Sequence, residues 1–400
     1  MRREWIAVAY ALFALGGLIS LASAEEGRTS APRRIVYAWF PAQMADWDMK
    51  AIDWSALTHL CLRCVVLQPD GTIKPGWGTT PERIKAAVDE AHKHGVKVTV
   101  LTWGTNKEDS SKCLANHAEK LAQSLLDFVK AHDLDGVNMD DETWSKDNTV
   151  TKGPNRDLLT SFFKVLHQKF REARADYHLS WASPPVIAAS DKFGESWVDY
   201  RAIAEYLDAF TVMSYCMLPP GIGWTGSAQP VEGGGKVGEH ARDYATCLQD
   251  YLDATGGRKE KIVLGIGNAR GGTEWKCRSD QPLANIYPLI AKPRALTAEE
   301  ARANAGKYGR KFDPQQKAPW YCYQEGDHFV QGWYEDDESL AAKMKLATGK
   351  DVAGVCLWVL DGAKEPPETF KLLRQHVLGG SDHPLPKPSS PAGRKGRVKP

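Results

Sequence analysis

The 400-residue chain is predicted to be an α/β protein, a (β/α)8 TIM barrel with a small insertion subdomain after strand 7. Eight short apolar runs alternate with longer segments of helical periodicity. Most of the runs are continuous in Val, Ile and Leu, as expected for strands that are covered on both faces. A closed barrel satisfies this alternation, and an open doubly wound sheet is the alternative.

The predicted strands are short and mainly apolar, and they follow one another along the whole chain: Arg34–Phe40, Leu57–Leu67, Val96–Thr102, Leu134–Asp140, His178–Ala182, Ala209–Ser214, Lys261–Gly267 and Ala353–Trp358. Helices are predicted between them. Thr80 is a favourable N-cap and Pro81 fits the first helical position, so a helix should begin there and end before Gly95. Apolar residues at helical spacing predict further helices around 114–129 and 158–170, and weaker patterns cover 241–254 and 339–345.

The regular alternation stops between strand 7 and the helix near residue 340. Residues from about 270 to 332 are rich in Gly, Lys, Arg and aromatic side chains, which predicts the insertion subdomain. Residues 381–400 are rich in Pro, Lys and Arg and contain almost no apolar side chains, so a disordered basic tail is expected. A tail that binds an anionic surface is the alternative.

The N-terminal segment has the pattern of a signal peptide over residues 1–24. Arg2 and Arg3 precede an apolar run that ends near Leu21, and Ala22-Ser23-Ala24 provides small residues for cleavage after Ala24. An uncleaved membrane anchor is the alternative reading of the same run. The mature protein is therefore expected to be secreted or periplasmic, with no stable membrane insertion.

Net charge and cysteine positions limit the kinds of partner and cofactor that are expected. The formal charge of +1 argues against nucleic acid as a partner. The protein is expected to be a monomer. Cys61-x-x-Cys64 could suggest a redox or zinc site, but it lies within an apolar run that has no second Cys/His pair nearby, so buried thiols are favoured. No metal or other cofactor is expected. Cys277 and Cys322 are the pair predicted to form a disulfide.

The stretch from Leu134 to Glu142 carries the strongest chemical pattern. Strand side chains alternate between faces, so Asn138, Asp140 and Glu142 should share one face and line the barrel interior. Buried polar groups are costly unless they are paired or functional. Two carboxyls on one face also repel, which raises one pKa and lets an acid stay protonated near neutral pH. A surface acidic loop at 140–142 is the alternative.

The nine residues Leu134-Asp135-Gly136-Val137-Asn138-Met139-Asp140-Asp141-Glu142 resemble the strand-4 signature of glycoside hydrolase family 18, the chitinase family. Other segments agree with the resemblance. Met213-Ser214-Tyr215 is similar to the Met-x-Tyr that closes strand 6 of that family, and Gly354–Trp358 is similar to its last strand. Trp333–Ser339 resembles the family's segment before the last strand–helix pair. The resemblance covers residues 33–378, which would form the catalytic domain.

The resemblance implies a retaining hydrolysis in which the acetamido group of the substrate acts as nucleophile. It implies that Glu142 is the general acid and base, that Asp140 stabilises the positive intermediate, and that Tyr215 donates a hydrogen bond to the acetamido group. Asn138 would support Asp140 by hydrogen bonding, and Trp358 would stack on the sugar. Further substrate contacts are expected from three more side chains: Trp39, Met213 and Trp103.

Besides Ala38, which stands where Gly is usual beside Trp39, three positions depart from the family pattern. Thr102 stands where Ser is usual, Thr105 stands in place of a Gly, and Cys216 follows Tyr215 where Asp or Asn is usual. These changes leave Asp140 and Glu142 in place. They put the rate, the pH profile and the substrate in question.

The favoured function is an exported hydrolase of β-1,4-linked N-acetylglucosamine polymers, chitin or chitooligosaccharides. One alternative is a chitin- or carbohydrate-binding barrel without turnover. Another is an endo-β-N-acetylglucosaminidase that acts on N-glycans or peptidoglycan. A metal-dependent hydrolase is disfavoured, because the acids at 140–142 have no His partner at useful spacing.

Overall fold

The structure is a computed structural model of the chain. It describes residues 34–41, 49–76, 78–104, 106–144, 146–184, 197–217, 223–237, 240–287, 293–360 and 365–379. The predicted signal peptide, the basic tail and Thr105 lie outside these residues. Among the helices that are described, none has the length and apolar character needed to cross a membrane.

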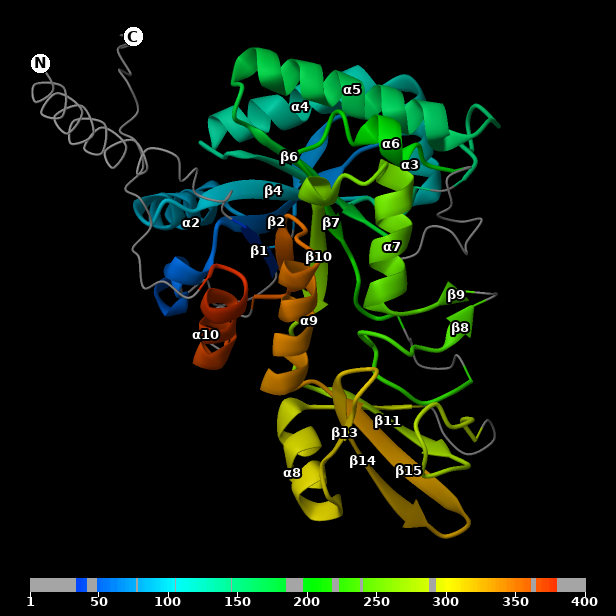
Figure 1. The fold of residues 1–400 in the computed structure, drawn as a ribbon. Helices are drawn as coiled ribbons and strands as arrows, with labels where there is room; N and C mark the ends of the chain where they lie inside the picture. Colours follow the sequence, from blue (N-terminus) through cyan, green and yellow to red (C-terminus); the bar gives the residue numbers. More distant parts are fainter. Residues whose placement is uncertain are drawn as a thin grey trace, which may run out of the picture. The chain divides into compact units, whose positions relative to one another are not determined.

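Eight parallel strands form a closed barrel (Figure 1). In chain order they are β1 Ile35–Pro41, β2 His59–Leu67, β4 Lys97–Trp103, β5 Gly136–Met139, β6 His178–Ser183, β7 Ala209–Val212, β10 Ile262–Gly267 and β16 Gly354–Trp358. Neighbouring strands pair in the order β1-β16-β10-β7-β6-β5-β4-β2, and β1 pairs with β2 to close the ring. The predicted barrel is therefore confirmed, and the open sheet is wrong.

Helices connect successive strands and cover the outside of the barrel (Figure 1). Their bounds are α2 Pro81–Lys93, α3 Lys107–Asn116, α4 Ala118–Ala131, α5 Asn155–Ala173, α6 Tyr200–Ile203, α7 Tyr244–Thr255, α9 Asp337–Gly349 and α10 Pro367–His376. Thr80 caps α2 as predicted, since its hydroxyl accepts the N–H of Arg83. The helical pattern around 114–129 is divided at His117 into α3 and α4.

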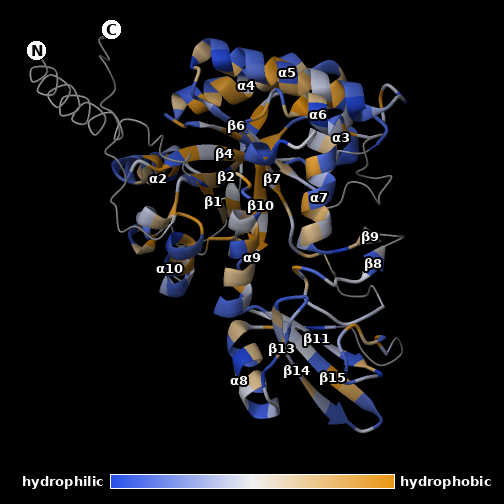
Figure 2. Ribbon diagram, viewed as in Figure 1, coloured by the Kyte–Doolittle hydropathy of each residue, from blue (hydrophilic) through white to orange (hydrophobic). Residues whose placement is uncertain are grey.

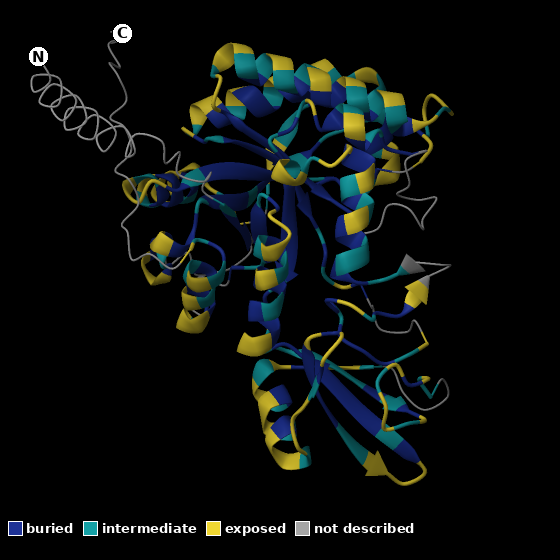
Figure 3. Ribbon diagram, in the orientation of Figure 1, coloured by how far each residue is buried: buried dark blue, intermediate teal, exposed yellow. Residues whose placement is uncertain are grey.

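The barrel strands bury both faces, as their continuous apolar character predicts. Side chains on the outer face, such as Leu60 and Leu62 of β2, pack against the helices in one large core. Side chains on the inner face form a smaller cluster that includes Trp39, Cys61 and Cys356. Figure 2 shows the hydrophobic strands surrounded by helices with mixed faces, and Figure 3 shows the same strands buried.

A five-stranded antiparallel sheet and one helix lie between β10 and α9, where the sequence predicts an insertion. The sheet has the order β12-β11-β15-β14-β13, and α8 packs on β14 and β15. The bounds are β11 Gly272–Cys277, β12 Arg294–Leu296, α8 Ala298–Tyr308, β13 Lys311–Asp313, β14 Ala318–Glu325 and β15 His328–Tyr334. Its core is aromatic: Trp320 and Trp333 stack at 5.2 Å between ring centroids.

Short elements complete the described chain: β3 Ile73–Pro75, which pairs with β2, the pair β8 Lys236–Val237 and β9 His240–Ala241, and the 3-10 turns η1 Met49–Ala51, η2 Trp54–Ala56 and η3 Lys259–Lys261.

The predicted disulfide between Cys277 and Cys322 is wrong. Cys277 lies on β11 opposite Phe329, whereas Cys322 lies on β14 opposite Gln331, so the whole width of β15 separates them. Cysteines two strands apart exceed the distance that a disulfide can span. All eight cysteines are unbonded, and Cys61 and Cys64 are both buried, as expected for packed thiols.

Candidate active site

The three polar residues of the strand-4 pattern lie at the carboxyl end of β5. Asn138 is fully buried inside the barrel, and Asp140 is only 3% exposed just beyond the end of the strand. Glu142 is exposed and begins a turn. Active sites of (β/α)8 barrels occupy this end. Asp140 is buried as predicted, whereas Glu142, which was also expected to line the interior, lies in an exposed turn because the strand ends at Met139.

Asn138 is held by three partners from other strands. Its amide nitrogen donates to Ser180 Oγ of β6 at 2.7 Å and to Thr211 Oγ1 of β7 at 2.9 Å. Its Oδ1 accepts a hydrogen bond from the Trp39 indole of β1 at 3.3 Å. The predicted hydrogen bond to Asp140 is not formed, because both amide hydrogens are directed at the hydroxyls of Ser180 and Thr211. Asn138 instead orients Trp39.

Asp140 is a buried carboxyl without full hydrogen bonding. Its backbone N–H donates to Thr102 Oγ1 at 2.9 Å, so the Thr at this position keeps the hydroxyl that the usual Ser would supply. Its Oδ1 is buried and has no hydrogen-bond partner among the described residues. Burial raises the pKa of Asp140 well above its ordinary value, the charges of Glu142 and Asp141 raise it further, and Arg63 opposes them.

Three aromatic side chains from distant parts of the sequence form one wall beside these acids. Tyr215 and Trp358 stack with centroids 6.0 Å apart and planes at 10°. Trp39 meets Tyr215 at 6.2 Å and Trp358 at 5.7 Å, each edge to face. Met213 packs on the same inner cluster. The structure thus brings three of the predicted substrate contacts, Trp39, Met213 and Trp358, together with Tyr215.

The Tyr215 hydroxyl remains protonated at neutral pH. Burial is the largest cause of a Tyr215 pKa well above its ordinary value, and the nearby thiol of Cys356 and the charges of Asp140 and Glu142 add to it. A protonated phenol can donate a hydrogen bond, which is the role expected for this residue.

Arg63 is a site residue that sequence reasoning missed. It lies on β2 with its guanidinium carbon 3.8 Å from the centre of the Trp103 ring, a cation–π contact. It also interacts electrostatically with Asp140 and Glu142, while partial burial lowers the pKa of its guanidinium. A signal was available, because His59, Cys61 and Arg63 alternate along an apolar strand and therefore share its inner face.

Replacing Arg63 with Met should raise the pKa of Asp140. The guanidinium stabilises the ionised form of that carboxyl, so its removal leaves burial and the neighbouring acids unopposed. The titration of Asp140 should be followed by its side-chain ¹³C chemical shift. Arg302→Met changes an exposed arginine of α8 and serves as the control. An Asp140 titration that is the same in the Arg63 variant and the wild type would contradict this account.

A cavity of about 350 Å³ continues the aromatic wall toward the insertion subdomain. Tyr215, Cys216 and Trp358 of the barrel line one part of it, and Trp275 and Trp333 of the insertion line another. The flat aromatic faces suit the C–H faces of a sugar ring. Only Trp358 among the Trp residues of this cavity was predicted as a contact, because the sequence does not tell which face of the insertion meets the barrel.

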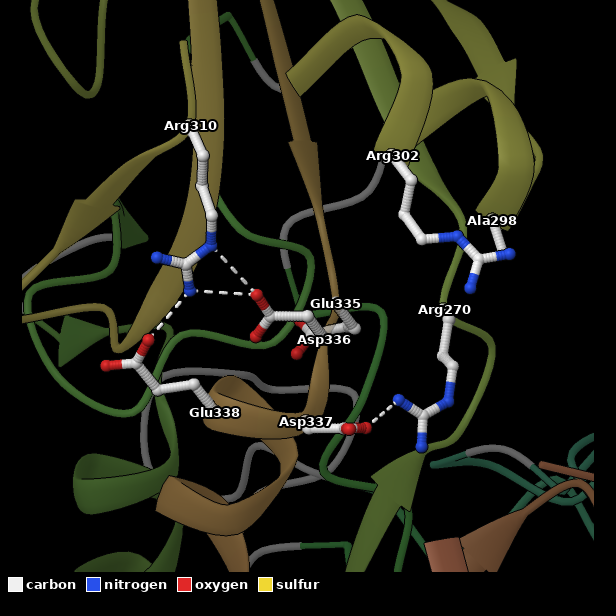
Figure 4. A pocket seen from close by; sticks show the side chains of 8 residues that line it. All are labelled: Arg270, Ala298, Arg302, Arg310, Glu335, Asp336, Asp337 and Glu338. Atoms are coloured by element: carbon white, nitrogen blue, oxygen red, sulfur yellow. Dashed lines mark hydrogen bonds and ion pairs between the residues drawn. The ribbon is translucent and has the colours of Figure 1, made fainter. Parts of the chain in front are cut away.

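A second pocket, of about 410 Å³, lies where the insertion joins the start of α9 (Figure 4). Five of its charged side chains pair with one another. Arg310 contacts Asp336 at 2.8 Å and Glu338 at 2.7 Å, and Arg270 pairs with Asp337. These partners largely neutralise each other's charge. The pocket is therefore a contact between the insertion and the start of α9, and it is a weaker candidate for substrate binding.

Across the described ranges, no three or more His, Cys, Asp or Glu side chains are grouped so that they could hold a metal ion. Of the acids at 140–142, Asp140 is buried beside the aromatic wall, whereas Glu142 is exposed.

Comparisons with known proteins give the family. The model of glycosyl hydrolases family 18 matches residues 33–363. A chitinase-like effector of Moniliophthora perniciosa is 22% identical over 226 residues, 56% of this chain and 52% of its own length. Probable chitinase 2 of Drosophila melanogaster is 23% identical over 316 residues, 74% of this chain and 62% of its own length. The chain therefore spans only about half to three fifths of these two relatives.

The fold has solved counterparts. The Group IV chitinase of Ostrinia furnacalis, in a structure with allosamidin, superposes with a TM-score of 0.69 and 20% identity, covering 86% of this chain and 97% of that one. This likeness supports the fold, while the match of the family model over most of the chain decides membership. The chain belongs to glycosyl hydrolases family 18.

Proposed function

We propose that the protein is an exported glycosidase that cleaves β-1,4-linked N-acetylglucosamine polymers by a substrate-assisted, retaining reaction. The observation that carries this proposal is the juxtaposition of a buried Asp140 and an exposed Glu142 with the aromatic wall of Tyr215 and Trp358. The wall offers a flat surface for a sugar, and the acids supply a proton and a negative charge beside it.

The reacting sugar would stack on Trp358, with its acetamido group directed toward Asp140 and Tyr215. The acetamido oxygen attacks the anomeric carbon, and the bond to the leaving oxygen breaks as Glu142 gives that oxygen a proton. The resulting oxazolinium is positively charged. Ionised Asp140, whose Oδ1 has no hydrogen-bond partner among the described residues, would accept the acetamido N–H and stabilise the charge.

The second half of the reaction returns the enzyme to its starting state. Glu142, now a carboxylate, takes a proton from a water that attacks the anomeric carbon, and the ring of the oxazolinium opens. The exposed position of Glu142 suits both steps, since it reaches the leaving group first and solvent afterwards. Two inversions at one carbon retain the configuration.

Two further features support the proposed substrate and location. The structural counterpart from Ostrinia furnacalis was solved in complex with allosamidin. Allosamidin is therefore a suitable probe for this site. The Arg2-Arg3 start, the apolar run and Ala22-Ser23-Ala24 support export to the periplasm or the medium.

Cys216 favours a second candidate, a carbohydrate-binding barrel without turnover. It is exposed beside Tyr215 with φ +53°, at a position where the family pattern has Asp or Asn. A thiol cannot replace a carboxylate or an amide in polar contact with a sugar. The relative from Moniliophthora perniciosa carries the name chitinase-like effector, which makes this alternative worth testing.

A defined hexasaccharide of β-1,4-linked N-acetylglucosamine separates these functions. Wild-type protein should release shorter oligosaccharides with retained configuration, and the same hexamer without acetyl groups should remain intact because it lacks the internal nucleophile. Binding of the acetylated hexamer without any release of product would favour the non-catalytic barrel. A parallel digest of glycoprotein and bacterial cell wall would reveal an endo-β-N-acetylglucosaminidase.

A further inference from the structure

Asp141 is a buried carboxyl that the proposed reaction does not use. It lies between Asp140 and Glu142 in the sequence, and it is 5% exposed. Burial raises the pKa of Asp141, while hydrogen bonds from Ser110 and Thr143 oppose that shift. Burying a carboxyl costs free energy, so the contacts that Asp141 makes must offset that cost.

The contacts of Asp141 enclose the turn that carries Glu142. Its Oδ1 accepts the backbone N–H of Thr143 at 2.9 Å and the Thr143 hydroxyl at 2.5 Å. The side chain therefore reaches across Glu142, from the residue before it to the residue after it, in an Asx turn. Thr143 Oγ1 also lies 2.6 Å from Ser110 Oγ on α3, which joins the turn to a helix.

The carboxyl of Asp141 also lies close to Gly104, in the loop after β4. A Cβ built on Gly104 would lie 2.1 Å from Asp141 Oδ1, so any larger residue would displace the carboxyl. Two loops, after β4 and after β5, thus meet through one side chain. Through Asp141 and Thr143, the turn with Glu142 is thus fixed to Ser110 of α3 and against Gly104.

We propose that Asp141 is a positioning residue that holds the Glu142 turn in the geometry needed for proton transfer. This inference rests on the proposed hydrolysis, in which Glu142 is the acid. Glu142 is exposed, so packing against its own side chain contributes little to its placement. Displacement of a reacting group by about 1 Å can cost about 100-fold in rate, and the fixed turn avoids that loss.

Asp141 has a second, electrostatic effect on the site. Asp140 faces Arg63 and Cys61 from β2 and Tyr215 after β7, besides the neighbouring Glu142 and Asp141. The negative charge of Asp141 contributes to the raised pKa of Asp140. Removing that charge should lower the pKa of Asp140 and move the acid limb of the pH profile to lower pH, because Asp140 must be ionised to stabilise the intermediate.

Two substitutions separate position from charge. Asp141→Ala removes the acceptor for Thr143, and it should lower kcat about 10- to 100-fold while KM changes less than about threefold. Asp141→Asn keeps an oxygen acceptor of the same size. It should retain kcat within about fivefold, with the acid limb shifted to lower pH. Asp127→Asn, on the exposed face of α4, is the matched control and should match wild type in both measurements.

Thr143→Val tests the same link if Asp141→Ala does not fold. It removes the hydroxyl that joins Asp141 to Ser110 but keeps the charge of Asp141, so kcat should fall while the acid limb stays in place. Wild-type kcat in a folded Asp141→Ala or Thr143→Val protein would overturn the positioning role. An unshifted pH profile in Asp141→Asn would overturn the electrostatic effect.

Two readouts need no turnover and separate this inference from the proposed function. Asp141→Ala should speed amide hydrogen exchange at residues 142–144, and Asp141→Asn should lower the Asp140 pKa followed by its side-chain ¹³C shift. A wild-type protein that cleaves no acetylated glycan would defeat the proposed function. Unchanged exchange and an unchanged Asp140 titration would defeat the inference even in an active enzyme.

Discussion

Glu142→Gln should lower kcat on a natural oligosaccharide at least about 100-fold, since a positioned general acid contributes about that much. Gln has nearly the same shape and keeps hydrogen-bonding capacity, but it cannot supply a proton to the leaving oxygen. Glu142 lies in an exposed turn just beyond β5, next to the buried Asp140, and the proposed reaction assigns it the proton. Hydrolysis of the acetylated hexasaccharide by the purified variant provides the measurement.

A change of leaving group sharpens the test. The aryloxide of an aryl glycoside departs without full protonation. Glu142→Gln should therefore slow the release of the aryloxide less than it slows cleavage of the hexasaccharide. Glu299→Gln changes an exposed acid in the first turn of α8 and should leave both rates at the wild-type level. Turnover near wild type in Glu142→Gln would mean that another group is the acid.

Asp140→Asn should reduce kcat by about 100- to 1000-fold, the range found when one preorganised electrostatic contact to a developing charge is removed. The carboxylate is needed for the oxazolinium, and an amide provides no negative charge. KM should change much less, because the substrate is neutral before the reaction. Steady-state kinetics on the same hexasaccharide give both constants.

The pH dependence of this variant carries independent information. Burial raises the pKa of Asp140. As the pH decreases, wild-type activity should therefore begin to fall at a higher pH than it would with an Asp of ordinary pKa. Asn does not titrate, and the acid limb that Asp140 produces should disappear from the residual activity. A wild-type acid limb that persists in Asp140→Asn would assign that limb to a different group.

The strands were predictable because burial on both faces leaves a local signal. Each predicted apolar run overlaps one barrel strand, and the alternation of side chains placed Asn138 and Asp140 on the inner face. Helix boundaries were less exact: α9 begins at Asp337 because Asp336 and Ser339 form a capping box, whereas the apolar pattern alone starts two residues later.

The predicted role of Asn138 shows where local reasoning fails. Its position on the strand followed from periodicity, but its hydrogen bonds go to Ser180, Thr211 and Trp39, which come from three other strands. The disulfide prediction failed for a related reason. Spacing along the chain cannot reveal that β15 lies between Cys277 and Cys322.

By itself, the sequence determined the alternation of strands and helices, the inward-facing Asn138 and Asp140 at the end of β5, and the family to which the motif points. Each depends on residues close together along the chain, where backbone geometry dictates which side chains share a face. Only the tertiary structure decided that Arg63 rests on Trp103 near Asp140, and that Asp141 joins its turn to Gly104 and α3. These contacts link separate strands and loops, whose register arises when the barrel closes.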